Sequence, residues 1–449
     1  MARGGLRNTL GEVDHTGKLI PQLAESWEPG DSADVWIWTL RKDVTFHDGK
    51  TLDQDDVINT IDYHRREGSK SSRKAFAKQV TEMIKDGKQR IVFKLSGKNA
   101  NYPFIGGGFE INSFDKDGKL YDFANGTGPF KLKEFVPGQR IRMERNRNYW
   151  DDTVGHFDEI TQVPILDVAA RQNALVTGEV DVISRPSPKT FPLLKRTKGI
   201  EAVSVTGALH RTWPMNINVP PFDNHDVRQA LRYAVKRQEI VDKVLNGGGS
   251  LGNDVPIARK DPMYNPNLPQ REFDPDKVKF HLKKAGMENL TVSLSTSEAI
   301  WSGALDAAQL YSEHAKEAGI NLVVNKVPND GYWNNVWLKH DWATSYWNAG
   351  PTADHMLTRA YSAEAPWNET KWKHPRFNQV LDLARGELDF NKARELYWEA
   401  QKIIYEEGAT VIPVFANELY AYSDKLAHGQ IAGNWEMDGY MLLKRWWFA

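Results

Sequence analysis

Gly-Thr-Gly-Pro-Phe-Lys-Leu (residues 126–132) opens the stretch of this chain that decides its fold. The stretch continues with Glu-Arg-Asn-Arg-Asn-Tyr-Trp (144–150) and ends with Leu-Val-Thr-Gly-Glu-Val-Asp-Val-Ile (175–183). These pieces hold turn-forming glycines and packing side chains, and none of them is a catalytic motif. They therefore indicate a scaffold, and the side chains that select a ligand have to be sought elsewhere in the chain.

The composition limits the class of protein. A chain of 449 residues is too long for one ordinary domain and predicts two or three lobes. Its hydrophobic content of 40% and charged content of 26% are typical of soluble globular proteins, and no apolar run is long enough to span a bilayer. A net charge of −1 gives no field that would gather nucleic acid, so no nucleic-acid partner is expected.

Reactive chemistry has little basis in this sequence. The absence of cysteine excludes disulfides, thiolate nucleophiles and cysteine-based metal sites, and it suits an oxidising compartment without excluding the cytosol. No HExxH, GxSxG or P-loop sequence occurs, and the 12 histidines are scattered. We therefore expect neither an enzyme nor a cofactor nor a metal site. The 16 tryptophans can serve packing or stack on a ligand in a cleft.

The N-terminal part predicts an α+β lobe around antiparallel sheet. Residues 36–40 and 90–95 alternate as strands do, and a helix is expected from residue 52, with acids in its first turn.

The middle of the chain predicts an α/β lobe. We expect strands over 211–218, 290–294, 320–327 and 342–347, and helices over 226–245, 278–285, 304–318 and 391–407. A further strand over 411–415 returns the chain to the first lobe. Crossings near 212–219 and 411–417 then form a hinge, which gives lobe 1 over 1–212, lobe 2 over 213–415 and a return to lobe 1 over 416–449.

Further fragments carry a family resemblance that covers nearly the whole chain. These fragments are Leu-Ala-Glu-Ser-Trp (23–27), Phe-His-Asp-Gly (46–49), Asn-Val-Pro-Pro-Phe-Asp (218–223), Val-Arg-Gln-Ala-Leu (227–231) and Asp-Pro-Asp-Lys (274–277). In this order, together with the block at 126–183, they resemble family 5 of the extracytoplasmic solute-binding proteins of ABC transporters, which includes peptide- and nickel-binding members.

The resemblance implies a fold and a role. The fold would be the two-lobed periplasmic binding protein-like fold (type II, cluster C), α/β in class, with a ligand cleft between hinged lobes. The protein would be a periplasmic monomer that hands a captured solute to the membrane permease. Family members carry several dozen residues before the segment at 23–27, so the chain is expected to be N-terminally shortened and to lack the family's first strand. Its first residues show no signal peptide, and the periplasmic location therefore comes from the resemblance alone.

The segment from Tyr346 to His355 is the most informative about the ligand. In peptide-binding relatives a loop aspartate pairs with the peptide's ammonium group, and here Ala349 or Gly350 stands at that position. Either Asp354 substitutes for it or the ligand is not an ordinary peptide. We expect Trp347 to form a cleft wall, with core packing as the alternative, and we include Asn348 beside it. His355 is reminiscent of the nickel-binding branch, but no second metal ligand lies nearby.

Other candidates for the cleft come from the crossings and from the second lobe. We expect Arg211 to pair with a carboxylate or phosphate of the ligand, with a salt bridge between domains as the alternative. The remaining candidates are Trp213, Asn216, Ser295, Thr296 and Asn417. A peptide or amino-acid conjugate is the ligand expected by default, and an oligosaccharide or an opine is the alternative ligand. Outside the class of binding proteins, the alternative is a hydrolytic enzyme.

Gly-Gly-Gly-Ser-Leu-Gly (247–252) formally matches the dinucleotide fingerprint GxGxxG. That fingerprint requires a strand before it and a helix after it, whereas here a helix precedes it and a polar loop follows. We therefore interpret it as the flexible end of a helix.

Overall fold

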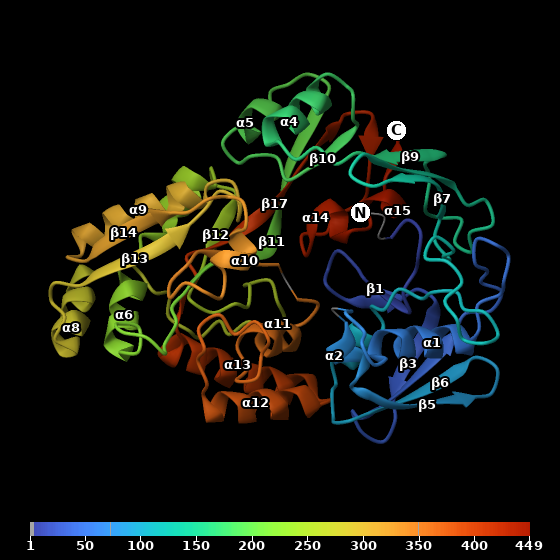
Figure 1. Cartoon of the computed structure of the whole chain (residues 1–449), viewed down its shortest axis with the longest axis horizontal. Helices are drawn as coiled ribbons and strands as arrows, with labels where there is room; N and C mark the ends of the chain where they lie inside the picture. The colour runs from blue at the N-terminus through green and yellow to red at the C-terminus, as the bar shows by residue number, and fades with distance from the viewer. Residues whose placement is uncertain (1–3, 72, 349) are drawn as a thin grey trace.

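The computed structural model describes residues 4–71, 73–348 and 350–449. Its two halves lie side by side in Figure 1, the blue and teal N-terminal part on the right and the yellow and orange middle of the chain on the left. Strands β11 (Ile200–Pro214) and β17 (Val414–Ser423) run through the centre between them. Among the described residues, no helix is both long and apolar enough to cross a membrane.

The first sheet of lobe 1 is antiparallel, as predicted. Its strands are β3 (Ala24–Pro29), β4 (Val35–Leu40), β6 (Arg90–Leu95) and β5 (Val80–Asp86), in that order. Trp36, Trp38 and Leu40 alternate along β4 and are buried, because successive strand residues face opposite sides. Helix α1 (Gln54–Arg65) packs on them and begins at Asp53, whose side chain accepts from the Asp55 and Asp56 backbone N–H groups. The small elements of this part are β1 (Gly11–Val13), β2 (Leu19–Pro21), α2 (Lys74–Ala77) and α3 (Tyr102–Gly106).

The glycines at the start of the 126–183 block allow two backbones to touch. A Cβ on Gly126 would lie 1.9 Å from the Leu6 carbonyl oxygen, and one on Gly128 would lie 2.2 Å from that of Gly5. With only hydrogen there, the Gly128 N–H donates to Leu6 O at 3.0 Å. The block continues as β7 (Phe130–Val136), β8 (Arg140–Arg145), β9 (Glu159–Gln162), α4 (Val168–Val176) and the start of β10 (Val182–Ser184), and α5 (Phe191–Leu194) follows it.

The central sheet joins the lobes. Its strand order is β10-β17-β11-β15, with β15 spanning Ser345–Trp347, and all these pairs are antiparallel. β12 (Gly249–Leu251) and β16 (Thr410–Val411) add short pairs with β17 and β11. The predicted lobe boundaries at 212 and 415 fall inside the paired strands β11 and β17, and they stay a prediction.

Lobe 2 contains the expected βαβ unit. β13 (Thr291–Thr296) and β14 (Asn321–Lys326) are parallel, and α9 (Ala304–Glu317) connects them. α8 (Pro275–Ala285) ends at Gly286, which has φ +67°. The other helices are α10 (Tyr332–Asn335), α11 (Ala353–Ala360), α12 (Pro375–Gly386) and α13 (Phe390–Glu407).

The helix expected over 226–245 is wrong as a single element. The structure has α6 (His225–Tyr233), α7 (Arg237–Glu239) and a π-helical turn over Ile240–Val244. Lys236, with ψ 86°, is not helical, and its N–H group donates to His314 at 3.3 Å. Tertiary partners therefore override the helical pattern at this point.

Two further strand expectations are corrected. The strand expected over 211–218 is the end of β11 and stops at Pro214, so Asn216 lies beyond it. The strand expected over 411–415 is divided, since β16 ends at Val411 and β17 begins at Val414. Pro413 between them has no N–H group to donate to a ladder.

The glycine-rich segment at 247–252 is also not simply a flexible helix end. Gly249–Leu251 forms strand β12 on β17, and a Cβ on Gly252 would lie 2.0 Å from the Ile412 carbonyl oxygen. Glycine is needed here for close packing of two backbones and not for a phosphate.

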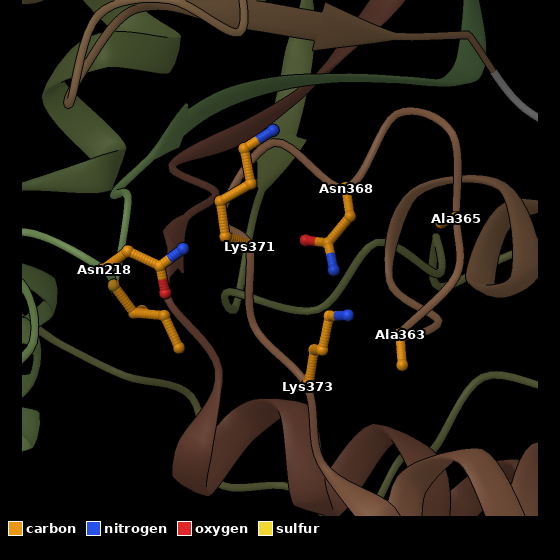
Figure 2. A pocket seen from close by; sticks show the side chains of 7 residues that line it. Asn218, Ala363, Ala365, Asn368, Lys371 and Lys373 are labelled. Atoms are coloured by element: carbon orange, nitrogen blue, oxygen red, sulfur yellow. The ribbon is translucent and has the colours of Figure 1, made fainter.

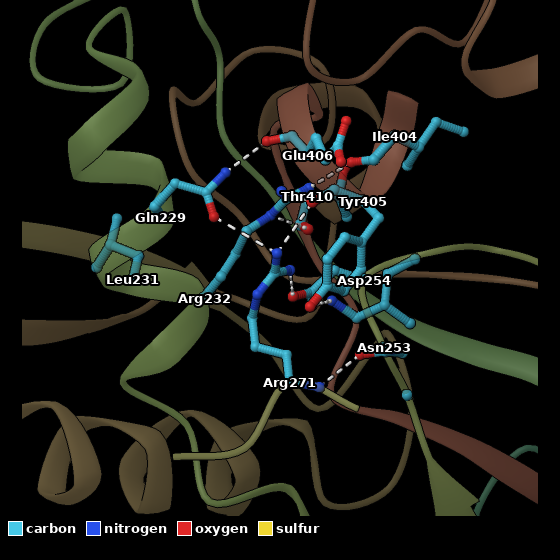
Figure 3. Close-up of polar contacts among 12 residues, drawn as sticks. Gln229, Leu231, Arg232, Asn253, Asp254, Arg271, Ile404, Tyr405, Glu406 and Thr410 are labelled. Carbon is cyan, nitrogen blue, oxygen red and sulfur yellow. Dashed lines mark hydrogen bonds and ion pairs between the residues drawn. The ribbon is translucent and has the colours of Figure 1, made fainter. Parts of the chain in front are cut away.

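A buried polar network fixes the return of the chain from lobe 2 (Figure 3). Asp254 accepts from Arg237 at 2.8 Å and from Arg271 at 2.6 Å, and its Oδ1 also accepts the Ile412 N–H at 2.8 Å. Arg232 donates to the carbonyls of Ile404, Tyr405 and Thr410, which ties the end of α13 to β16.

The C-terminal segment packs back on lobe 1. It contains β18 (Leu426–Ala427), α14 (Glu436–Gly439), α15 (Leu442–Arg445) and β19 (Trp447–Phe448). The buried carboxylate of Glu12 pairs with Lys444 at 2.7 Å and with Arg445 at 2.5 Å. The two ends of the chain therefore belong to the same half of the molecule, as Figure 1 also shows.

Candidate functional site

The candidate site lies where β15 pairs with β11. Arg211 stands opposite Tyr346, and His210 stands opposite Trp347. Because neighbouring strand residues face opposite sides, Arg211 and Tyr346 share one face of the sheet and His210 and Trp347 share the other. We call Arg211, Tyr346, Trp301 and Glu418 the junction site.

Arg211 is buried without a counter-ion. Its guanidinium carbon lies 4.4 Å from the Trp301 ring centroid and 5.7 Å from that of Tyr346. Within the described part of the chain, no hydrogen bond or ion pair engages this guanidinium, and its Nε is fully buried. Burial lowers the pKa of Arg211 to about 9, against the raising effect of the nearby Glu418 carboxylate. The interdomain salt bridge considered for Arg211 does not form in the described residues.

Glu418 on β17 is the second charged group of the junction site. Its exposed fraction is 7%, and burial raises the pKa of its carboxyl, an effect that Arg185 and Arg211 oppose. Arg185 is already paired with Glu436 at 2.8 Å. No ion pair to Glu418 exists at 4.0 Å or less among the described residues. Glu418 was not among the predicted residues; its predicted neighbour Asn417 instead donates from its amide to Ser204 at 2.9 Å.

Trp347 faces the interior of lobe 2. Its Nε1 donates to Glu369 at 2.9 Å, and the other oxygen of that carboxylate accepts from Trp337 at 2.6 Å. Arg359 covers the Trp347 ring at 4.7 Å and donates weakly to the Asn348 carbonyl at 3.5 Å. This placement favours the packing alternative for Trp347. Ala349 lies outside the described residues.

Asp354 and His355 both contact other side chains of the protein. The buried Asp354 carboxylate pairs with Arg385 at 3.1 Å and also accepts from the Thr358 hydroxyl. Burial raises its pKa, although Arg385 acts in the opposite direction. The His355 ring stacks on Phe76 with centroids 5.3 Å apart, and its buried Nδ1 has no partner in the described structure. Burial, with Arg359 and Arg73 nearby, lowers the pKa of His355 to about 3.

The other predicted residues are occupied by internal contacts. Trp213 is fully buried and stacks on Tyr311 at 4.5 Å, so it packs in the core of lobe 2. The Ser295 hydroxyl contacts His340 at 2.9 Å, and that of Thr296 accepts from Thr344 at 3.0 Å. The Asn216 amide oxygen accepts the Asn218 N–H at 3.1 Å.

The lobes touch on both sides of this region. On one side, the α2–α11 seam consists of the Phe76–His355 stack, a bond from the Ala100 N–H to Arg385 O at 2.7 Å and one from Asn101 to the Tyr397 hydroxyl at 3.1 Å. On the other side, the α5–α9 seam consists of the Lys189–Asp306 ion pair at 2.5 Å and a bond from Asn246 to Pro188 O at 2.7 Å.

A separate hollow lies on lobe 2 (Figure 2). Its volume is about 350 Å³, and it is lined by Ile217, Asn218, Ala363, Ala365, Asn368, Lys371 and Lys373. None of the residues selected from the sequence lines it. No cluster of three metal-ligating side chains occurs in residues 4–71, 73–348 and 350–449.

Comparison with known proteins shows which family has this fold. The model of the bacterial extracellular solute-binding proteins, family 5 middle, matches residues 18–369. The chain belongs to this family. Family 5 proteins bind solutes outside the cytoplasm for transport and are not enzymes, so the hydrolase alternative is set aside.

Similar curated proteins share about a quarter of their residues with this family 5 chain. The peptide transport periplasmic protein SapA of Salmonella typhimurium is 26% identical, over 93% of this chain and 82% of SapA. A dipeptide-binding protein of Pseudomonas aeruginosa is 26% identical, over 94% and 86%.

Solved structures confirm the two-lobed fold. DppA from Helicobacter pylori in complex with the peptide STSA has a TM-score of 0.83 at 22% identity, over 99% of this chain and 93% of that one. AgaA from A. tumefaciens R10 in complex with agropinic acid has a TM-score of 0.82 at 20% identity, over 99% and 93%. Their sequence identities are low, so these likenesses establish the fold and not the ligand.

Proposed function

We propose that this protein is the periplasmic substrate-binding component of an ABC importer, acting as a monomer that captures a peptide or an amino-acid conjugate between its lobes. The observation that carries the proposal is Arg211, a buried guanidinium without a counter-ion on a strand that joins both lobes. A buried charge without a partner is costly, which favours a ligand group that completes it. The names of SapA and of the dipeptide-binding relative support a peptide-type ligand.

The mechanism follows from the hinge. Since β11 and β17 are adjacent, a small change in these two strands rotates one lobe against the other. A ligand that contacts both lobes stabilises the closed form, because only that form offers both sets of contacts. The closed protein would then dock on the membrane permease and release its solute there.

An opine-type conjugate is the second candidate. At the expected ammonium-binding position stands Gly350 or the adjacent residue, and Asp354 is engaged by Arg385. An oligosaccharide has less support, since a neutral ligand would leave Arg211 without a counter-ion.

Isothermal titration calorimetry tests the proposal with four probe classes: free amino acids, di- and tripeptides, agropinic acid and maltose. We expect saturable binding of one peptide or conjugate class with a stoichiometry of one, and the probe recovered unchanged. Binding of maltose alone would support the sugar alternative. Failure of every class to bind would contradict the proposed function.

A further inference from the structure

We propose that Arg211 and Glu418 form a split charge pair that recognises a solute carrying both a carboxylate and an ammonium group. The carboxylate binds Arg211, and the ammonium binds Glu418. The inference rests on the proposed function, because it names the ligand chemistry of the same interlobe site.

The two side chains leave the same face of the central sheet. Leu209 pairs with Ala416 and His210 with Phe415, so Arg211 follows the face of Val414 and Ala416. Glu418 continues that face two residues after Ala416. The four-residue step from Val414 to Glu418 spans about 13 Å of strand.

At this spacing the two charges do not form an ion pair, but each still influences the other. An arginine and a glutamate side chain reach toward each other over much of such a span, and each group affects the pKa of the other. Yet no ion pair at 4.0 Å or less joins them in the described structure. Neither side chain therefore neutralises the other, and a ligand that bridges both charges would supply the missing partner of each.

Neighbouring charges are engaged elsewhere. Arg185, which also influences Glu418, is held by Glu436 at 2.8 Å. Lys260 donates to the Thr206 carbonyl at 2.9 Å. A ligand ammonium is thus the missing partner of Glu418.

The surroundings of Arg211 suit a carboxylate. The guanidinium carbon lies 4.4 Å from the Trp301 ring centroid and 5.7 Å from that of Tyr346. A carboxylate binds a guanidinium through the N–H groups at the edge of its plane, whereas a cation–π contact uses the face of an aromatic ring. Aromatic contact and carboxylate binding are therefore compatible at this residue.

The assignment also explains why the loop after β15 can lack an acid. Asp354 is committed to Arg385, and Gly350 has no side chain. In this chain the acid for the ammonium comes from β17, a strand that connects the lobes. Ligand binding would then act directly on the hinge.

The test combines variants with blocked ligands. The probes are free alanine, trialanine and agropinic acid, and for trialanine also the N-acetylated and C-amidated forms. In wild type we expect each block to weaken calorimetric binding about tenfold or more. Glu418→Gln should weaken the binding of trialanine by a similar factor and leave the binding of the N-acetylated form unchanged. Arg211→Gln should likewise weaken the binding of trialanine and leave the binding of the C-amidated form unchanged. The relative affinities of alanine and trialanine distinguish a free amino acid from a peptide as the source of the two charges, and agropinic acid, whose lactam nitrogen is uncharged, tests a ligand that carries the carboxylate alone.

Matched controls keep the test decisive. Glu134 and Arg140 form an exposed ion pair at 2.9 Å on the β7–β8 hairpin, so Glu134→Gln and Arg140→Gln should change nothing. Where a glutamine variant does not fold, Glu418→Asp and Arg211→Lys replace it, with a smaller loss of affinity expected. Equal affinity for free and blocked trialanine in wild type, or equal losses for both in a variant, would overturn the charge pair while leaving a binding protein. Binding of maltose alone would overturn it too, whereas no binding by any probe would contradict the proposed function itself.

Discussion

The imidazole of His355 in lobe 2 stacks on the phenyl ring of Phe76 in lobe 1, with centroids 5.3 Å apart and planes inclined by 27°. The rings belong to α11 and α2, which are far apart in the sequence. Near them, Asn101 of lobe 1 reaches the Tyr397 hydroxyl of lobe 2 at 3.1 Å. The α2–α11 seam therefore holds the lobes together through contacts that need no ligand.

Removing the Phe76 ring should favour the open form. An aromatic pair contributes about 0.5–1.5 kcal/mol beyond its buried area, so Phe76→Ala should weaken ligand binding roughly three- to tenfold. Small-angle scattering of the ligand-free variant should show a larger radius of gyration than wild type. Phe135→Ala, which removes an exposed ring on β7 of the same lobe, is the control. An unchanged radius and affinity in Phe76→Ala would mean that the seam plays no part in closure.

Acid should destabilise the fold through two buried histidines. Burial lowers the pKa of both His210 and His355 to about 3, and nearby Arg359 adds to the effect. An unfolded histidine has a pKa of about 6.5, so this stabilisation is complete above pH 6.5 and is lost as the pH falls toward 3. Each histidine should remove up to about 1.4 kcal/mol of unfolding free energy per pH unit in that range.

Urea unfolding at pH 7.5, 6.5 and 5.5 measures the slope of the unfolding free energy against pH. His210→Gln should reduce the slope, whatever it does to the stability at pH 7.5. The exposed His156 provides the control, since His156→Gln should leave the slope as it is. A slope that is the same in wild type and in His210→Gln would contradict the prediction.

Asp354 should be a structural residue and not a ligand clamp. Its carboxylate is buried against Arg385, and removing one partner of such a pair costs about 3 kcal/mol or more. We expect Asp354→Asn to lower the melting temperature clearly while the affinity for trialanine stays within about twofold of wild type. Asp382 pairs with the same arginine at 2.8 Å but is exposed, so Asp382→Asn should change stability little. If Asp354→Asn instead lost affinity at unchanged stability, Asp354 would be the residue that binds the ammonium group of the ligand.

Local periodicity predicted most of the fold, and long-range partners account for what it missed. The alternation of Trp36, Trp38 and Leu40 depends on neighbours in sequence and gave β4 correctly. The break in the helix after Tyr233 is accompanied by long-range contacts, from the Lys236 N–H to His314 and from Arg237 to Asp254, which no local pattern reveals. Family 5 membership was likewise recoverable, because several short fragments occur in the family's order.

The candidate site was predicted only in part for the same reason. Arg211 was selected as a residue on a crossing strand, and the structure places it at the junction of the lobes. The role of Asp354 depends on Arg385, which lies 31 residues later on another helix. Glu418 was missed, since its face of the sheet follows from the register of β17 on β11, and that register shifts between Val205 and Leu209.

The strongest single effect on stability is expected at Asp254 (Figure 3). Burial alone would raise the pKa of this carboxyl, but Arg237, Arg271 and Arg232 outweigh it and hold the pKa below its ordinary value. Asp254→Asn leaves these buried arginines without their counter-ion, which should cost about 3–5 kcal/mol in urea unfolding. Asp242→Asn, at an exposed site on the π-helical turn, is the matched control and should cost less than about 0.5 kcal/mol.

The same variant also tests how lobe 2 supports the hinge. Asp254 accepts the Ile412 N–H at 2.8 Å, and Ile412 lies between β16 and β17. Weakening this bond should loosen the start of β17, the strand that carries Glu418. Hydrogen exchange followed by mass spectrometry should therefore show faster exchange over 411–418 in Asp254→Asn than in Asp242→Asn, at a urea concentration where both are folded. Equal exchange rates would mean that the network stabilises lobe 2 without setting the position of β17.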